Sequence, residues 1–261
     1  MARFFGKFGK NGETPKAKAS VERMANDPFG EMRAGESTLM ECCEKGDLQG
    51  SQRAYRSGNH DAIRAKNEYG ETCMHLACQG GHMQVARWLY VAGAAEDIHA
   101  LSNDGDTCML LASLGGHLSV CQWLHEAGCI EEIESQNAHG NNPLHFACRQ
   151  GQLKVAQWLT SVAETPAVEF VTTQNKQNNT PMHFACRGGH LDVCKWLFET
   201  GAEADVRTPN AYGWTPMHSC HWKGHSAVIK WLNEVGGAED MESEDNEGHT
   251  PIYWAQRARG N

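Results

Sequence analysis

The sequence of 261 residues predicts an all-α fold, a solenoid of stacked helix–turn–helix units, and three observations lead to this prediction. One segment, TPMHFACRGGHLDVCKWL from Thr180, recurs along the chain. The copies begin 35 residues apart, with a single step of 38. Residue types that begin and end helices hold the same places in each copy.

The repeats set the expected domain organisation. The clearest copies are TCMHLACQGGHMQVARWL from Thr72, TCMLLASLGGHLSVCQWL from Thr107, NPLHFACRQGQLKVAQWL from Asn142 and TPMHSCHWKGHSAVIKWL from Thr215. Fainter copies begin at Ser37 and Thr250. We therefore expect a repeat domain over 37–261, with units starting near 37, 72, 107, 142, 180, 215 and 250, after a largely irregular arm over 1–36.

Each unit is expected to open with a helix of about two turns. Its first residue can cap a helix N-terminus by accepting from a free backbone N–H, and these caps are Ser37, Thr72, Thr107, Asn142, Thr180, Thr215 and Thr250. Proline follows four of them, where its missing N–H costs nothing. Nine residues after the cap comes a glycine suited to a left-handed helix end, at 46, 81, 116, 151, 189 and 224.

A second helix and a turn complete the unit. Val193, Trp196 and Leu197 are spaced to share one helical face, and other units repeat the pattern. Two residues before each cap stands a residue that tolerates positive φ in a tight turn: Gly35, Gly70, Gly105, Gly140, Asn178, Gly213 or Gly248.

The motif G-x-TP-[LM]-H-x-A-x-x-GH-[LM]-x-V-x-x-WL resembles the ankyrin repeat over residues 37–261. The resemblance implies helix pairs with β-hairpin fingers, and the two residues beyond the family's usual length of about 33 predict slightly longer fingers. A similar longer finger is expected at 165–171, where the chain gains three residues. Tryptophan replaces the usual leucine at 88, 123, 158, 196 and 231, and we expect it to fill the interface between helices.

The histidines and cysteines of the repeat could be metal ligands or packing residues. His and Cys stand three apart on one helix in several units, but two ligands do not make a zinc site, so we expect neither metal nor cofactor. The resemblance implies that His75, His145, His183 and His218 bond to backbone and tie neighbouring units. The cysteines are expected as small packing residues. Acidic pairs such as Glu96-Asp97 and Glu131-Glu132 could attract calcium or a basic partner, although simple solvation is favoured.

Other function classes find little support. The sequence contains none of the common nucleophile, metalloprotease or nucleotide motifs, so we expect no enzyme. The net charge of -9 argues against nucleic-acid binding. No signal peptide is apparent, and eleven cysteines without CxxC spacing suit a reducing compartment, so a cytoplasmic location is expected. An organelle is the alternative if the arm is a targeting peptide.

The resemblance implies a protein-binding role through a concave groove lined by fingers and by the ends of the first helices. Interface anchors are typically Trp, Tyr and Arg. The candidate partner-binding residues in those places are Arg149, Phe170, Lys176, Arg187, Tyr212, Trp214, Trp222 and Lys223. The alternatives are that Trp222 packs on its own fingers, that Trp214 covers a backbone edge, and that Phe170 packs beneath its finger.

The N-terminal arm differs in charge from the rest of the chain. Residues 1–20 carry five basic residues and one acidic residue, which leaves -13 on the remainder. The cluster Arg3, Phe4, Phe5, Lys7, Phe8 and Lys10 could contact a membrane surface or an assembly, or form an untethered tail. The expected function is an adaptor that binds another protein. The alternative is a permanent structural subunit of a large assembly, anchored by this arm.

Overall fold

The computed structural model describes residues 37–57 and 60–259. A compact unit begins at Ser37. The cluster of arginine, lysine and phenylalanine residues between Arg3 and Lys10 lies outside the described residues. None of the helices in the described ranges has the length and hydrophobicity needed to span a lipid bilayer.

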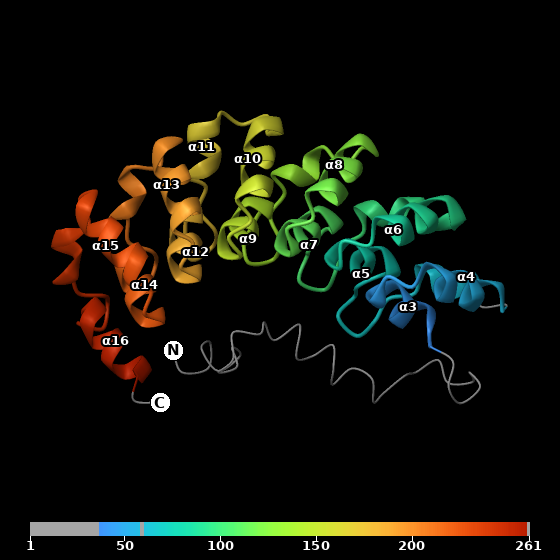
Figure 1. The fold of residues 1–261 in the computed structure, drawn as a ribbon, viewed down its shortest axis with the longest axis horizontal. Helices are drawn as coiled ribbons and strands as arrows, with labels where there is room; N and C mark the ends of the chain where they lie inside the picture. Colours follow the sequence, from blue (N-terminus) through green and yellow to red (C-terminus); the bar gives the residue numbers. More distant parts are fainter. Residues whose placement is uncertain (1–36, 58–59, 260–261) are drawn as a thin grey trace. The chain divides into compact units, whose positions relative to one another are not determined.

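The described part is a stack of helix pairs in chain order, as predicted (Figure 1). The first helices of the units lie along one side, called here the inner row, and the second helices along the other, the outer row. The inner row is α3 (Leu39–Lys45), α5 (Cys73–Gln79), α7 (Cys108–Gly115), α9 (Pro143–Arg149), α12 (Pro181–Gly188), α14 (Pro216–Lys223) and α16 (Pro251–Arg259). The outer row is α4 (Leu48–Arg56), α6 (Met83–Leu89), α8 (Leu118–Glu126), α10 (Leu153–Val162), α13 (Leu191–Glu199) and α15 (Ser226–Glu234).

Short helical turns follow the outer helices. They are η2 (His60–Arg64), η3 (Tyr90–Ala94), η4 (Ala95–His99), η5 (Glu131–Ile133), α11 (Ala167–Val171), η6 (Ala204–Val206) and η7 (Ala238–Met241). The segment that holds the three extra residues of the long step includes the five-residue helix α11, which contacts α10. The prediction of a longer finger at 165–171 was therefore wrong, because the apolar residues there fold into a helix whose Phe170 and Val171 are buried.

The fingers are tight turns, and the described residues contain no β-strand. Each finger is closed by two backbone bonds, as where Asn137 N–H donates to Asn141 O at 3.0 Å and Gly140 N–H donates to Asn137 O at 2.8 Å. Neighbouring fingers share one further backbone bond, such as Asn103 N–H to Tyr69 O at 2.8 Å. The fingers thus keep the hairpin connection expected of ankyrin repeats without the ladder of bonds that defines a strand.

The predicted helix ends are confirmed with one exception. Asn178 has φ 56°, and it is the only non-glycine with positive φ among the described residues. The glycines nine residues after the caps are also left-handed, with Gly116 at φ 77°. In the first unit the cap is Thr38, whose Oγ1 accepts from Glu41 N–H at 3.1 Å. The expectation of Ser37 was wrong by one residue, because the helix begins one position later than the repeat predicts.

The predicted histidines tie neighbouring units. In units two, four, five and six, Nδ1 of the histidine bonds the cap residue, and Nε2 reaches the carbonyl of the finger residue directly before the next cap. These bonds join His75 to Asp106 O at 3.2 Å, His145 to Asn179 O at 3.2 Å, His183 to Trp214 O at 3.0 Å and His218 to His249 O at 3.3 Å. Both ring nitrogens are therefore used in holding the stack together.

A second set of histidines, which the sequence analysis did not single out, points back to the preceding unit. Their Nε2 atoms bond carbonyls at the end of the previous inner helix: His82 to Glu44 O, His117 to Gln79 O, His190 to Arg149 O and His225 to Arg187 O, at 2.9–3.1 Å. Unit four has Gln152 at this place. Units two, five and six are thus bonded by histidine in both directions.

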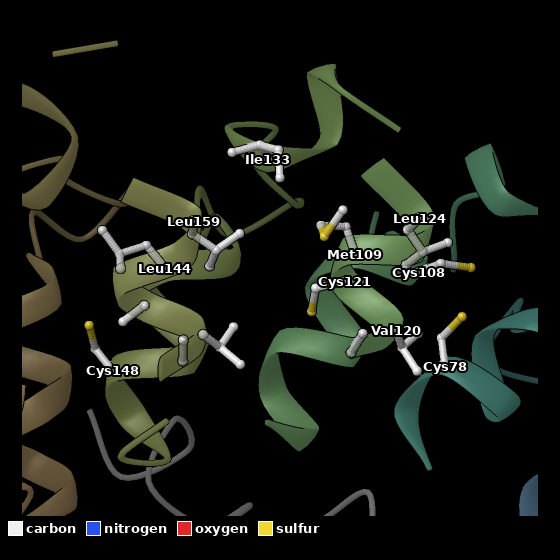
Figure 2. Packing of buried hydrophobic residues seen from close by; sticks show 14 of the residues in the cluster. Cys78, Cys108, Met109, Val120, Cys121, Leu124, Ile133, Leu144, Cys148 and Leu159 are labelled. Carbon is white, nitrogen blue, oxygen red and sulfur yellow. The ribbon is translucent and has the colours of Figure 1, made fainter. Parts of the chain in front are cut away.

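The cysteines pack in the core. All eleven are buried and unpaired. Figure 2 shows Cys78, Cys108 and Cys121 beside Val120 and Leu124. The small thiols allow close approach of the helices, as the sequence predicted.

The five tryptophans of the outer row are less buried than expected. Trp231 is 7% exposed, whereas the other four are only partly buried. Four of the five pack edge-to-face on a ring from the preceding unit, in the pairs Tyr55–Trp88, Tyr90–Trp123, His125–Trp158 and Phe198–Trp231, with centroids 5.8–5.9 Å apart. The expectation that they fill the helix interface therefore holds fully for Trp231 alone.

Candidate protein-binding face

Four of the predicted site residues lie at the ends of three successive inner helices, and we call them the basic face. Arg149 ends α9, Arg187 lies in the last turn of α12, and Trp222 and Lys223 end α14. The guanidinium carbon of Arg187 lies 5.0 Å from the Trp222 ring centroid, and Lys223 Nζ lies 4.3 Å from it. The Trp222 ring is therefore in contact with two cations, an arrangement that its negative π-face favours.

The charges of the basic face act on one another. Burial lowers the pKa of Arg149. Burial, followed by the positive charge of Arg149, lowers the pKa of Arg187 to about 10. Burial and the charges of Arg187 and Arg149 also lower the pKa of Lys223. At neutral pH Arg187 remains charged at this pKa, so positive charge is concentrated in partly desolvated surroundings, where an anion gains more Coulomb energy than in open water.

Three of the four residues share one position of the repeat. Arg149, Arg187 and Trp222 occupy the same position of units four, five and six, just before the end of the inner helix. Units one to three have Glu44, Gln79 and Leu114 there. Because successive inner helices pack side by side, the repeat places these side chains next to one another.

Trp214 does not belong to an exposed site. It is 8% exposed, its Nε1 donates to Asp245 Oδ2 at 3.0 Å, and its ring lies 4.9 Å from that of Trp254. The prediction of Trp214 as a binding anchor was wrong, because its ring is enclosed by the next unit.

Phe170 is also buried, at 1% exposure, and the prediction that it contacts a partner was wrong. The reason is that α11 directs it inward, among the largest fully buried side chains. Lys176 is exposed in the finger of unit five, and Tyr212 is partly buried in that of unit six. Both remain candidates at the finger side of the basic face.

The last unit contributes a cluster that the sequence analysis missed. His249 stacks on Tyr253 with centroids 3.9 Å apart, and Trp254 donates its Nε1–H to Asp245 Oδ2 at 2.8 Å. Trp254 contacts Trp214, which in turn lies 5.9 Å from Trp222. The aromatic residues of units six and seven thus form one packed group, in which Trp214 contacts both Trp254 and Trp222. The signal available in the sequence was the pair Tyr253-Trp254 on the faint seventh copy.

The stacked helix pairs, the capping histidines and the fingers define the chain as a helical-repeat protein. A family model for ankyrin repeats matches residues 39–130, 92–169 and 165–245. The chain therefore belongs to the ankyrin-repeat family. A comparison with curated proteins found no match. Ankyrin repeats are generally protein–protein interaction modules, and the family is typically non-enzymatic.

Proposed function

We propose that this protein is a non-enzymatic adaptor that binds an acidic segment of a partner protein through the basic face of units four to six. The observation that carries the proposal is the contact of Arg187 and Lys223 with the Trp222 ring, with the charge of Arg149 close enough to lower the pKa of both. Tryptophan and arginine are the residues most often found as energetic centres of protein interfaces.

Charge complementarity supports an acidic occupant. The net charge of the chain is -9, so the basic face is a local departure from an acidic surface. After burial, the charge of Arg149 lowers the pKa of Arg187, and the charges of both arginines lower the pKa of Lys223; a carboxylate-rich segment placed beside them would oppose these shifts. Lys176, exposed on the finger of unit five, adds a further positive charge to these units. We also retain the cytoplasm as the proposed compartment, because eleven thiols without a disulfide pattern suit a reducing environment.

The test is binding of a fluorescein-labelled oligoglutamate peptide to the full chain, followed by fluorescence anisotropy. The variant R187E/K223E reverses two charges of the basic face and should weaken binding at least about tenfold, or ~1.4 kcal/mol. The matched control is K195E/K230E, which makes the same charge change at exposed lysines of the outer helices α13 and α15. The proposal predicts near-native affinity for this control and weaker binding of the peptide at higher salt.

Two outcomes would contradict the proposal. Equal weakening by both double variants would mean that only net charge matters, and no weakening by R187E/K223E would remove the basic face from the binding site. W222A provides a further check on the anchor, because it removes the ring without changing the charge. The proposal predicts weaker peptide binding by W222A with the native circular-dichroism spectrum retained.

A further inference from the structure

A contact between a basic residue and a carboxylate of the next unit recurs on the loops after the outer helices. Arg64 bonds Glu96 at 2.7 Å and Asp97 at 3.4 Å, and Arg207 bonds Glu239 at 2.8 Å and Asp240 at 3.3 Å. At the equivalent place between the loops after α6 and α8, His99 Nδ1 lies 2.5 Å from Glu132 Oε1. These contacts fasten one unit to the next.

The His99 contact departs from the other two in a second residue. Cys129 occupies the position that is Ala94 at the Arg64 contact and Gly237 at the Arg207 contact. Its Sγ lies 4.0 Å from His99 Nδ1, and one ligand atom from each of His99, Cys129 and Glu132 lies within 4.8 Å of the others. Among the described residues this is the only such group of three His, Cys, Asp or Glu side chains. The one unit junction with histidine in place of arginine is thus also the one with cysteine in place of alanine or glycine.

We propose that His99, Cys129 and Glu132 bind one zinc-class divalent cation between the loops that follow α6 and α8. An imidazole nitrogen, a thiolate and a carboxylate are a donor set that zinc accepts readily, whereas calcium and magnesium prefer oxygen alone. The three side chains supply three positions of a tetrahedron and leave the fourth for water or another ligand.

The geometry requires only small movements. Tetrahedral zinc with ordinary bond lengths places its ligand atoms about 3.3–3.6 Å apart. The present separations of 2.5 Å and 4.0 Å therefore need shifts of about 1 Å or less. The His99 side chain is 50% exposed, so it can turn to admit an ion, while Glu132 is 13% exposed and Cys129 is buried.

The proton balance follows from the groups present. Burial and the neighbouring Glu132 raise the pKa of the Cys129 thiol to about 12, so the free site holds a neutral thiol at pH 7. Binding releases this thiol proton to solvent and leaves a thiolate on the ion. His99 coordinates through its Nδ1 lone pair, with its proton on Nε2. One thiolate and one carboxylate then neutralise the two charges of the cation.

The experiment uses the chelator-treated full chain titrated with Co²⁺, whose bond to thiolate gives a near-ultraviolet charge-transfer band. We expect one ion per chain, a band of this kind, and its displacement by Zn²⁺. The variants H99R and C129A each install the residue that other units carry, Arg64 or Arg207 and Ala94 or Ala202, so both should fold. C129A should lose the band, and H99R should weaken binding at least about tenfold.

The ten other cysteines are the internal control, because they stay intact in C129A. A band that persists in C129A, or an unchanged affinity in a folded H99R, would overturn the proposal. Absence of any cobalt–thiolate band in the native chain would do the same. Failure of this test would leave the proposed binding of acidic segments unaffected, because the basic face lies on other units and on the inner row.

Discussion

Trp214 donates its indole Nε1–H to Asp245 Oδ2 across 3.0 Å, and this bond joins the fingers of units six and seven. Earlier fingers are joined at the same two places by asparagines that donate backwards along the stack: Asn137 to Asp106, Asn175 to Asn141 and Asn210 to Asn179, at 2.7–2.8 Å. Between units six and seven the direction is reversed, because Trp214 of the earlier finger donates to Asp245 of the later one. The side-chain ladder therefore continues although both residue types change.

Replacing Trp214 with phenylalanine should lower the free energy of unfolding by about 1–3 kcal/mol. The ring is retained, but the buried Asp245 loses one donor and keeps the bond from Trp254 at 2.8 Å. Urea unfolding followed by circular dichroism measures the loss. W222F is the control, because Trp222 is only partly buried, and it should change stability by less than about 0.5 kcal/mol. Equal stability of W214F and the native chain would show that the ladder bond contributes nothing.

Replacing Asp205 with asparagine should stabilise the protein above pH 6 by about 1–3 kcal/mol. Burial raises the pKa of Asp205 to about 6, and its Oδ2 is buried without a bonded partner in the described structure. In the unfolded chain the Asp205 carboxyl group ionises near pH 4. The unfolded chain therefore holds fewer protons at this residue than the folded chain between about pH 4 and 6, and stability falls as the pH rises through that range. D205N removes this loss, which urea unfolding at pH 4.5 and pH 7 would show.

The control for Asp205 is Asp240, the equivalent residue one unit later. The Asp240 carboxylate bonds Arg207 at 3.3 Å, so D240N removes an ion pair as well as a buried charge. We expect D240N to gain less stability than D205N at pH 7. A D205N variant that is less stable than the native chain at pH 7 would contradict the inference that the carboxylate is poorly compensated.

Acid should weaken the stack through the buried histidines His145 and His183. Burial lowers the pKa of each to about 4, although the backbone carbonyls that they bond act in the opposite direction. The pKa of a histidine in the unfolded chain is about 6.5. The contribution of the two histidines to the free energy of unfolding is therefore complete above that pH and is lost as the pH falls towards 4, at up to about 3 kcal/mol each. H183Q should therefore show a smaller loss of stability between pH 7.5 and pH 5.

The comparison for H183Q is H139Q, which changes an exposed histidine of the unit-four finger. It should leave the difference in stability between the two pH values as it is in the native chain. H183Q should also lower stability at pH 7.5, because Thr180 and Trp214 lose their bonds to the ring. An unchanged pH dependence in H183Q would refute a titrating role for this residue.

Replacing Gln152 with histidine should stabilise the protein by about 0.5–1.5 kcal/mol. Histidines at the same place in units two, three, five and six bond a carbonyl of the preceding inner helix. In unit four the matching carbonyl is that of Leu114 in α7. Thermal unfolding would report the gain, and Q152A separates the new bond from the simple loss of glutamine. No difference between Q152H and Q152A would contradict the expected bond.

Much of the fold was predictable because the same helix-capping, turn and bonding residues recur in several units. The capping residues, the left-handed glycines and Asn178, and the inter-unit histidines recur at fixed positions, and local backbone chemistry explains each of them. The basic face was predictable for the same reason. Arg149, Arg187 and Trp222 hold one repeat position, and neighbouring units stack in register.

The errors fall where the chain departs from the repeat. Trp214 stands where earlier units carry acidic or amide side chains, and Phe170 lies in the three-residue expansion, so no pattern showed which way the two rings face. The sequence also did not predict the group of His99, Cys129 and Glu132. Its members come from two units and are brought together only by the packing of one loop on the next.

By itself, the sequence determined the seven-fold periodicity, the helix boundaries to within about a residue, and the burial of the thiols, because these depend on local dihedral preferences and on hydrophobic spacing. Only the tertiary structure decided which aromatic rings the next unit encloses and which polar groups meet across unit junctions. Such contacts depend on the distance between side chains about 35 residues apart, which stacking sets and local preference does not.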